Sequence, residues 1–294
     1  HYPGCMMLPH DPLWPRSRTL FSHEAISSPD VALVGVPAHS TSISPTAADK
    51  TPAAIRACLE RYSLSHSDPA VNMSKLTIHD CGDVISPDID ESKTIAQLRE
   101  IAEKSGAVIA LGGDNSITYA GFSASSTTGL ITFDAHYDLR DGINNGSPVR
   151  RLIEAGLDGR RVVQIGIADF SNSPEYAARA RDYGITVIPR SALRASTPAQ
   201  LWQQAVAIAG SNIYVDFDID ICDRSVAPAC PAAAPGGISA DELRQFAFLA
   251  GSSHGVKAID ITEIDATKDS ADERTVRLGS LVVLEFLAGF STRA

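Results

Sequence analysis

The sequence predicts an α/β protein with a single three-layer α/β/α domain and a central, mostly parallel sheet of about eight strands. Short apolar runs alternate with longer helical patterns along the 294 residues. The short runs are rich in valine and isoleucine and contain few polar residues, as in strands that are covered on both faces. No linker-like stretch and no internal repeat divides the chain, so we expect one folded domain.

The predicted strands are eight apolar runs. They cover residues 31–36, 75–79, 107–111, 130–133, 162–167, 186–188, 212–217 and 257–261. Segment 229–237 follows the seventh run and ends with one proline and two glycines in succession, Pro235, Gly236 and Gly237. These residues restrict the backbone to turns, so the segment is predicted to be a rigid loop.

Helices are predicted between the strands, at residues 51–62, 92–103, 173–183 and 239–249. Pro52 stands in the first turn of the first helix, where a missing N–H costs nothing. Ser239 and Glu242 form a capping box at the start of the fourth. Residues 1–30 are predicted to be an irregular arm because their prolines exclude a helix: Pro3, Pro9, Pro12 and Pro15. We expect this arm to wrap the surface or reach a neighbouring subunit.

The composition argues against several classes of protein. The 25 Lys and Arg against 35 Asp and Glu give a net charge of −10, which repels nucleic acid and suits a cationic metal. No apolar run reaches the roughly 18 residues that span a bilayer, and the start of the chain does not resemble a signal peptide. Five widely spaced cysteines without a CxxC pair argue against disulfides and zinc, and fit a cytoplasmic protein.

Acidic side chains follow the predicted strands at their carboxyl ends, where open α/β sheets bind ligands. These positions are Asp134 and Asp138 after one strand, Asp218 and Asp220 after another, and Glu263 after the last. His136 lies between the first two. Five carboxylates at one edge would repel each other strongly without a cation. Oxygen donors with one imidazole suit Mn²⁺, and Mg²⁺ or Zn²⁺ less well.

Three motifs in this chain resemble those of the ureohydrolase superfamily of arginases, agmatinases and formimidoylglutamases. They are Gly-Gly-Asp-Asn-Ser at 112–116, Asp-Ala-His-Tyr-Asp at 134–138, and Asp-Ile-Asp-Ile-Cys-Asp at 218–223, followed by Ala-Pro at 227–228 and Pro-Gly-Gly at 235–237. The resemblance runs from about Val31 to the C-terminus. It implies an arginase-like catalytic domain over 31–294. It also implies a homo-oligomer, a trimer or a hexamer.

The resemblance implies two Mn²⁺ ions per subunit, a metal-bridging hydroxide and attack on an amidino carbon. Asp134 and Asp218 would bridge the metals. Asp138 would bind one of them, with Asn115 as a further ligand. The family has histidine at that position, and an amide is a weaker ligand, so this metal is expected to bind less tightly.

The same resemblance assigns His136 and Asp220 to the other metal. Glu263 would accept a hydrogen bond from the substrate's cationic nitrogen, because an amidinium needs a charge-assisted acceptor to fix its orientation. Asp138 or Asp220 would take up a proton and pass it to the leaving nitrogen. The catalytic residues expected are therefore Asp138, Asp220 and Glu263.

Arginases and agmatinases carry His-Gly-Thr beyond the second motif, whereas this chain has Asn145-Gly146-Ser147. This form, with Asp-Pro-Leu-Trp-Pro-Arg at 11–16, resembles the formimidoylglutamases of histidine breakdown, which cleave N-formimino-L-glutamate to L-glutamate and formamide. Asn145 and Ser147 are then expected to bind substrate. Cations are needed for the two carboxylates of glutamate, and the candidates are Arg140, Arg150 and Arg151.

Two other functions stay open from the sequence. The chain could hydrolyse a guanidino compound, namely agmatine, arginine or a guanidino acid, and release urea. The absence of a histidine at Asn145 counts against arginine and agmatine. Alternatively, the change from histidine to Asn115 could have abolished binding of the metal at that position. The chain would then be a non-catalytic member of the family. The retained cluster of acids counts against this, because nothing structural requires it.

Overall fold

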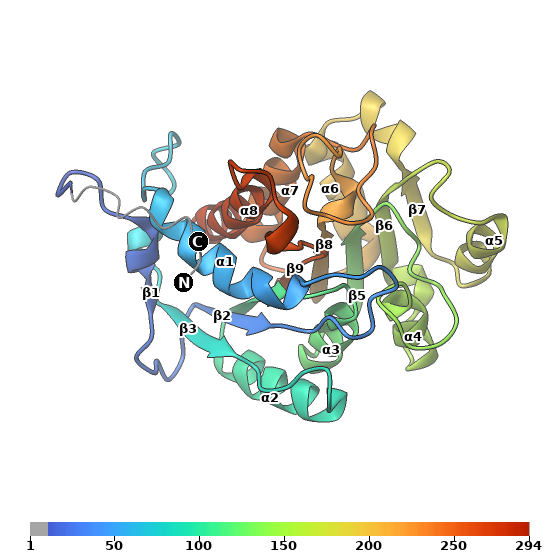
Figure 1. Cartoon of the computed structure of the whole chain (residues 1–294), viewed down its shortest axis with the longest axis horizontal. Coiled ribbons are helices and arrows are strands. Elements are labelled where there is room, and N and C mark those ends of the chain that lie inside the picture. The colour runs from blue at the N-terminus through green and yellow to red at the C-terminus, as the bar shows by residue number, and fades with distance from the viewer. Residues whose placement is uncertain (1–10, 294) are drawn as a thin grey trace.

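The computed structural model describes residues 11–293, which form one nine-stranded sheet with every strand pair parallel (Figure 1). The strand order is β1-β3-β2-β4-β9-β8-β5-β6-β7. The strands are β1 (Phe21–Ser22), β2 (Val31–Val36), β3 (Ile78–Asp83), β4 (Ala107–Gly112), β5 (Gly129–Phe133), β6 (Val162–Ile167), β7 (Thr186–Pro189), β8 (Ile213–Asp218) and β9 (Val256–Thr262). The predicted α/β class and parallel sheet are confirmed.

Eight α-helices lie among the described residues and cover both faces of the sheet (Figure 1). They are α1 (Thr51–Cys58), α2 (Glu91–Lys104), α3 (Ile117–Ala124), α4 (Pro148–Glu154), α5 (Pro174–Asp182), α6 (Pro198–Ala209), α7 (Ala240–Ser252) and α8 (Arg274–Phe290). One apolar core joins α1, α6, α7 and α8 to the sheet, and a second joins α2, α3, α4 and α5 to it. The two cores separate the molecule into three layers. Within residues 11–293, no helix has the length and apolar character needed to cross a membrane.

Strand β3 differs most from its prediction. It begins at Ile78 rather than at residue 75 and continues to Asp83. The carboxylate of Asp80, in the middle of the strand, is buried and accepts hydrogen bonds from Arg18 and Arg56. These partners are far away in the sequence, so the local pattern of polar residues did not indicate a strand.

The helices depart from the prediction in number and in length. Helix α1 ends at Cys58, and a 3₁₀ turn (Leu59–Arg61) completes the predicted segment. Helices α3, α4, α6 and α8 lie outside the four predicted helical segments. Because α3 and α8 are buried along most of their length, they lack the polar face that marks an amphipathic helix. Helix α6 begins with a capping box of Thr197 and Gln200, which the sequence did offer as a signal.

The described part of the N-terminal arm, residues 11–30, lies against the first strands of the sheet. It contains a 3₁₀ turn (Ser17–Leu20) and the short strand β1, which pairs with β3. The hydroxyl of Ser17 donates to the Leu59 carbonyl across 2.5 Å. The arm is thus less irregular than predicted. The expectations about Pro3 and Pro9 fall outside the described residues.

Candidate metal centre

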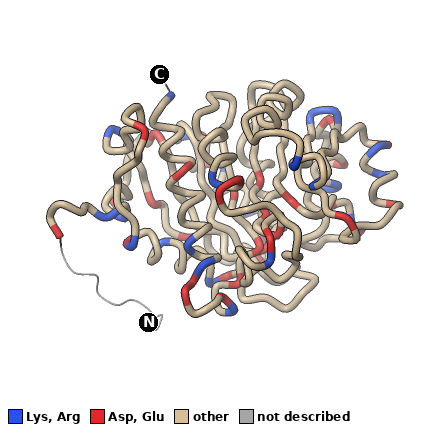
Figure 2. Tube along the Cα trace, turned by 90° about the horizontal axis from the view of Figure 1, so that it is seen from above, with Lys and Arg blue, Asp and Glu red and all other residues tan. Residues whose placement is uncertain are grey.

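Four neighbouring strands bring predicted site residues to one edge of the sheet. In the order β4-β9-β8-β5, Asn115 follows β4, Glu263 follows β9, Asp218 ends β8 and Asp134 follows β5. Because the strands are parallel, their carboxyl ends share this edge. Figure 2 shows several acidic segments near the middle of the molecule.

Asp134, His136 and Asp220 form the tightest group. Their potential ligand atoms all lie within 4.8 Å of one another. His136 Nδ1 is 2.6 Å from Asp220 Oδ2 and 3.4 Å from Asp134 Oδ1. The backbone holds both carboxylates in place, because Asp134 Oδ1 accepts from the His136 N–H and Asp220 Oδ1 accepts from the Ala135 N–H. Three predicted ligands are therefore close enough to share one cation.

Asp218, Asp138 and Asn115 complete the predicted set. Asp218 Oδ1 accepts from the backbone N–H of Asp220 at 2.8 Å, across a short 3₁₀ turn (Ile219–Ile221). Asp138 has a left-handed backbone, with φ of 53°. Such strain in a non-glycine residue is typical of functional sites. The Asn115 side-chain nitrogen donates to Asp138 Oδ2 at 2.5 Å.

Burial makes these carboxylates costly to ionise. It raises the pKa of Asp134 to about 7 and raises the pKa values of Asp138 and Asp218 well above their usual range, with neighbouring carboxylates adding to the effect. Asp220 differs, because the charge of His136 and its hydrogen bonds lower its pKa despite burial. In return, Asp220 raises the pKa of His136 to about 12.

A metal ion fits this set of residues. Asp134 Oδ2 is buried and has no hydrogen-bond partner among residues 11–293. An unpaired buried carboxylate oxygen is unfavourable unless it coordinates a cation. Carboxylate oxygens with one imidazole are donors that suit Mn²⁺. The geometry and the electrostatics therefore both agree with a metal centre.

Glu263 lies at the edge of this cluster with a left-handed backbone, with φ of 65°. Its Oε1 accepts from the Asn115 backbone N–H at 2.7 Å and from Asn145 Nδ2 at 2.9 Å. Burial and the charge of Asp114 raise its pKa to about 7. Asn145 is thus in the site, where it holds Glu263 in position.

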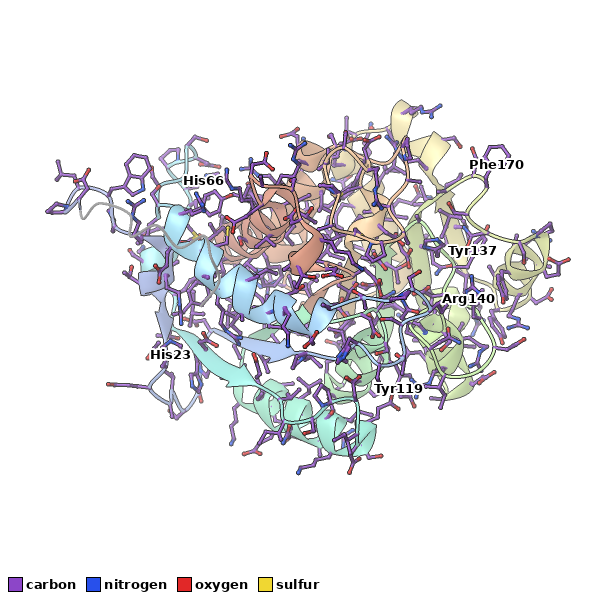
Figure 3. All side chains as sticks on the ribbon, viewed as in Figure 1. His23, His66, Tyr119, Tyr137, Arg140 and Phe170 are labelled. Atoms are coloured by element: carbon purple, nitrogen blue, oxygen red, sulfur yellow. The ribbon has the colours of Figure 1, made fainter. Side chains whose placement is uncertain are left out.

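A cavity of about 820 Å³ opens beside the cluster. The residues that line it include His136, Asp138, Arg140, Asp218, Asp220 and Glu263. Figure 3 shows Tyr137, Arg140 and Phe170 on the same side of the molecule, in the loops that follow β5 and β6. A small polar substrate can reach the predicted ligands through this cavity.

Only one of the three candidate arginines lines the cavity. The Arg150 guanidinium binds the carbonyls of Arg140 and Gly142 and pairs with Glu154. Arg151 pairs with Glu91 through both terminal nitrogens. Its guanidinium also lies over the Tyr119 ring, 3.7 Å from the centroid. Both side chains therefore brace α4.

Ser147 also lies outside the cavity lining. It is fully buried, and its hydroxyl donates to the Asn144 carbonyl and accepts from the Asn144 N–H. It shapes the turn that precedes α4 (Pro148–Glu154) and presents Asn145 to Glu263.

The loop after β6 was not predicted to belong to the site. Asn172 lines the cavity, accepts from the Tyr137 N–H at 3.1 Å and donates to the Ala135 carbonyl at 2.9 Å. It thereby holds the segment that carries His136. Phe170 is fully exposed at the rim. The rule that ligands bind after parallel strands applied to this loop as well, but the loop carries no cluster of acids to draw attention.

Comparisons with known proteins agree with this site. The model of the Arginase family matches residues 29–289. A formimidoylglutamase from Halalkalibacterium halodurans is 36% identical over 275 residues, which cover 87% of this chain and 86% of that protein. The crystal structure of Bacillus subtilis formimidoylglutamase is similar with a TM-score of 0.91 and 28% identity, covering 98% and 96% of the two chains. A structure of Trypanosoma cruzi formiminoglutamase with Mn²⁺ is similar with a TM-score of 0.87 and 26% identity. The match covers 96% of this chain and 100% of that one.

Proposed function

The chain belongs to the arginase family, and from this premise we propose that it hydrolyses N-formimino-L-glutamate to L-glutamate and formamide with the help of Mn²⁺. The observation that carries the proposal is a single cavity lined by acidic metal ligands, by Glu263 and by Arg140. An amidine that carries carboxylates needs all three. Its cationic end requires an acceptor, its anionic end requires a cation, and its carbon requires an activated water.

Two Mn²⁺ ions would be held by six side chains. These are Asn115, Asp134, His136, Asp138, Asp218 and Asp220. Bound there, the ions supply Lewis acidity, which lowers the pKa of water towards about 7 and makes hydroxide available at neutral pH. Asp138 and Asp220 line the cavity. Either can take up the proton that is released and deliver it to the departing glutamate nitrogen.

Glu263 would orient the amidinium. Both hydrogen bonds that hold its carboxylate end on Oε1, so Oε2 is left to accept from the substrate. A carboxylate that two donors already fix in place loses little side-chain entropy when the substrate binds. Charge-assisted hydrogen bonds of this kind have a defined direction, so the formimino carbon is presented to the metal side of the cavity.

Arg140 would bind the glutamate carboxylates. Among residues 11–293 its guanidinium has no hydrogen bond or ion pair, although its backbone N–H donates to the Gly146 carbonyl. The side chain passes over Gly146, where an added Cβ would lie 2.7 Å from Arg140 Cδ. The glycine therefore leaves the room that Arg140 needs beside the cavity.

The proposal is tested by loading the purified protein with Mn²⁺ and measuring formamide, ammonia and urea from a panel of amidines. We expect formamide from N-formimino-L-glutamate. Agmatine should be a poor substrate, because its free amine would approach Arg140. Faster turnover of agmatine, or urea release from a guanidino acid as the main activity, would contradict the proposal.

Asp134→Ala provides the matching test of the metal centre. The variant should lose bound Mn²⁺ and activity while keeping its fold, because the Asp134 carboxylate accepts its hydrogen bond from the His136 N–H in the same loop. Asp141→Asn is the control, since Asp141 also lines the cavity but pairs with Arg179. Elemental analysis measures the Mn²⁺ content. If the Asp134→Ala variant binds as much Mn²⁺ as the wild type, Asp134 is not a metal ligand.

Histidine breakdown, assembly as a trimer or hexamer and a cytoplasmic location stay predictions. Cys58, Cys81, Cys222 and Cys230 form no disulfide among the described residues, and Cys5 lies outside them. Sedimentation of the purified protein with and without Mn²⁺ would measure the oligomeric state directly.

A further inference from the structure

The amide of Asn115 is held from two sides. Its nitrogen donates to Asp138 Oδ2, on the side of the metal centre. On the other side, its oxygen lies 2.8 Å from the Thr118 hydroxyl and 3.2 Å from the Thr262 hydroxyl. Asn115, Thr118 and Thr262 are all buried. The orientation of this amide decides which of its atoms faces a bound cation.

Thr118 has two acceptors within reach but only one hydrogen. Its Oγ1 lies 2.8 Å from Asn115 Oδ1 and 2.9 Å from Asp260 Oδ2. Asp260 is fully buried, and the same Oδ2 accepts from the Tyr214 hydroxyl at 2.8 Å. A hydrogen bond to a buried carboxylate is stronger than one to a neutral amide oxygen. The Thr118 hydrogen therefore goes to Asp260, and Asn115 meets only lone pairs on Thr118.

We propose that Thr118, held by Asp260, is a positioning residue that turns the Asn115 amide oxygen towards the metal. A half-turn about the Cβ–Cγ bond exchanges the amide oxygen and nitrogen without moving the backbone. After that turn, Nδ2 donates to Thr118 and Oδ1 faces Asp138. A cation beside Asp138 would repel the amide hydrogens and attract the oxygen, so metal binding and the hydroxyl favour the same orientation.

This inference rests on the metal centre proposed above. It explains how an amide can serve where an imidazole would bind more strongly. Before a metal binds, an asparagine without such a partner can present either its nitrogen or its oxygen. A partner that accepts on the far side removes that ambiguity, in the way that hydrogen bonds around metal sites fix the orientation of their ligands.

The test compares four variants by Mn²⁺ calorimetry and by electron paramagnetic resonance of the bound ions. Thr118→Val removes the hydroxyl but keeps the shape, and Thr118→Ser keeps the hydroxyl. Thr132→Val is a matched control, because Thr132 is a buried threonine whose hydroxyl has no partner among the described residues. Tyr214→Phe removes the other donor to Asp260 and leaves Thr118 in place. Melting of the metal-free proteins shows whether each variant folds.

We expect Thr118→Val to weaken the site that contains Asn115 by about 10–100-fold, the usual effect of losing a partner of a metal ligand, and to leave the tighter site unchanged. The exchange coupling between the two ions should fall with it. Thr118→Ser, Thr132→Val and Tyr214→Phe should bind like the wild type. Two unchanged sites in a folded Thr118→Val protein would overturn the inference, and so would an equal loss in Thr118→Ser. Wild-type protein that bound no Mn²⁺ would overturn the metal centre itself.

Discussion

The side-chain amide of Asn145 donates a hydrogen bond of 2.9 Å to Glu263 Oε1, and joins residues that are 118 positions apart in the sequence. Asn145 is fixed in turn, because its Oδ1 accepts from the Ile43 backbone N–H at 3.0 Å. Three separate segments thus set the direction of one carboxylate. The corresponding residue in arginases, by the resemblance described above, is a histidine that shuttles protons. In this chain Asn145 instead holds the Glu263 carboxylate in position.

Replacing Asn145 by alanine should lower kcat/KM for N-formimino-L-glutamate by about 10–100-fold, because a lost hydrogen bond to a charged group costs roughly 1.5–3 kcal/mol. Steady-state kinetics at saturating Mn²⁺ measure the effect. Ser171→Ala is the control, since Ser171 lines the same cavity. An Asn145→Ala enzyme with unchanged kinetics would show that Glu263 needs no such support.

Arg140→Ala should lower kcat/KM by roughly 30–1,000-fold, which corresponds to about 2–4 kcal/mol for an orphaned charge pair. Arg151→Ala should instead lower the melting temperature, because it removes the pairing with Glu91 and the contact with Tyr119, and should change KM little. The two variants are matched in charge. The opposite result, a higher KM for Arg151→Ala and an unchanged KM for Arg140→Ala, would show that the substrate carboxylates bind at α4 instead.

Gly146→Ala tests the position of Arg140 without removing its charge. The new methyl group would lie within 2.7 Å of Arg140 Cδ, so the flexible end of the arginine must shift. We expect a higher KM with little change in Mn²⁺ affinity. If substrate binding were unaffected in kinetics and calorimetry, the arginine would be acting only through its charge at a distance.

Asn115→His should tighten the weaker metal site by about 10–100-fold, because an imidazole donates more strongly to a first-row metal than an amide does. The Mn²⁺ concentration for half-maximal rate should fall accordingly. Calorimetric titration of both proteins measures the change. Two equally tight sites in the wild type, unaltered by the histidine, would mean that the amide is no handicap.

Melting of the metal-free protein should depend on pH in a specific direction. The pKa values of Asp134 and Glu263 are raised to about 7 in the folded protein, so the folded state holds these protons more tightly than the unfolded chain. Their contribution to stability is complete below about pH 4 and is lost as the pH rises through 7. The melting temperature in EDTA should therefore fall between pH 5 and pH 8.

Mn²⁺ should reverse this trend, because a bound cation stabilises the ionised carboxylates and competes with protons at low pH. The rise in melting temperature on adding Mn²⁺ should be larger at pH 8 than at pH 5.5. Asp134→Asn, which cannot ionise, should flatten the metal-free profile. A metal-free melting temperature that climbs steadily from pH 5 to pH 8 would contradict this account.

The sequence by itself determined the fold class, most strand positions and which acidic residues meet at the candidate metal centre. Strands covered on both faces are apolar in most positions, so a local pattern identifies them. The rule that parallel strands share an edge then brings Asp134 and Asp218 together without any knowledge of packing.

The tertiary structure alone decided which polar residues have partners. Asp80 could join a strand only because Arg18 and Arg56 donate hydrogen bonds to its buried carboxylate. Arg151 does not line the cavity because it pairs with Glu91. The Thr118 hydroxyl donates to Asp260, which is 142 positions away in the sequence. Hydrophobic burial follows a repeating pattern that local sequence records, whereas a hydrogen bond depends on where two distant segments place single atoms. That placement exists only after the sheet has assembled.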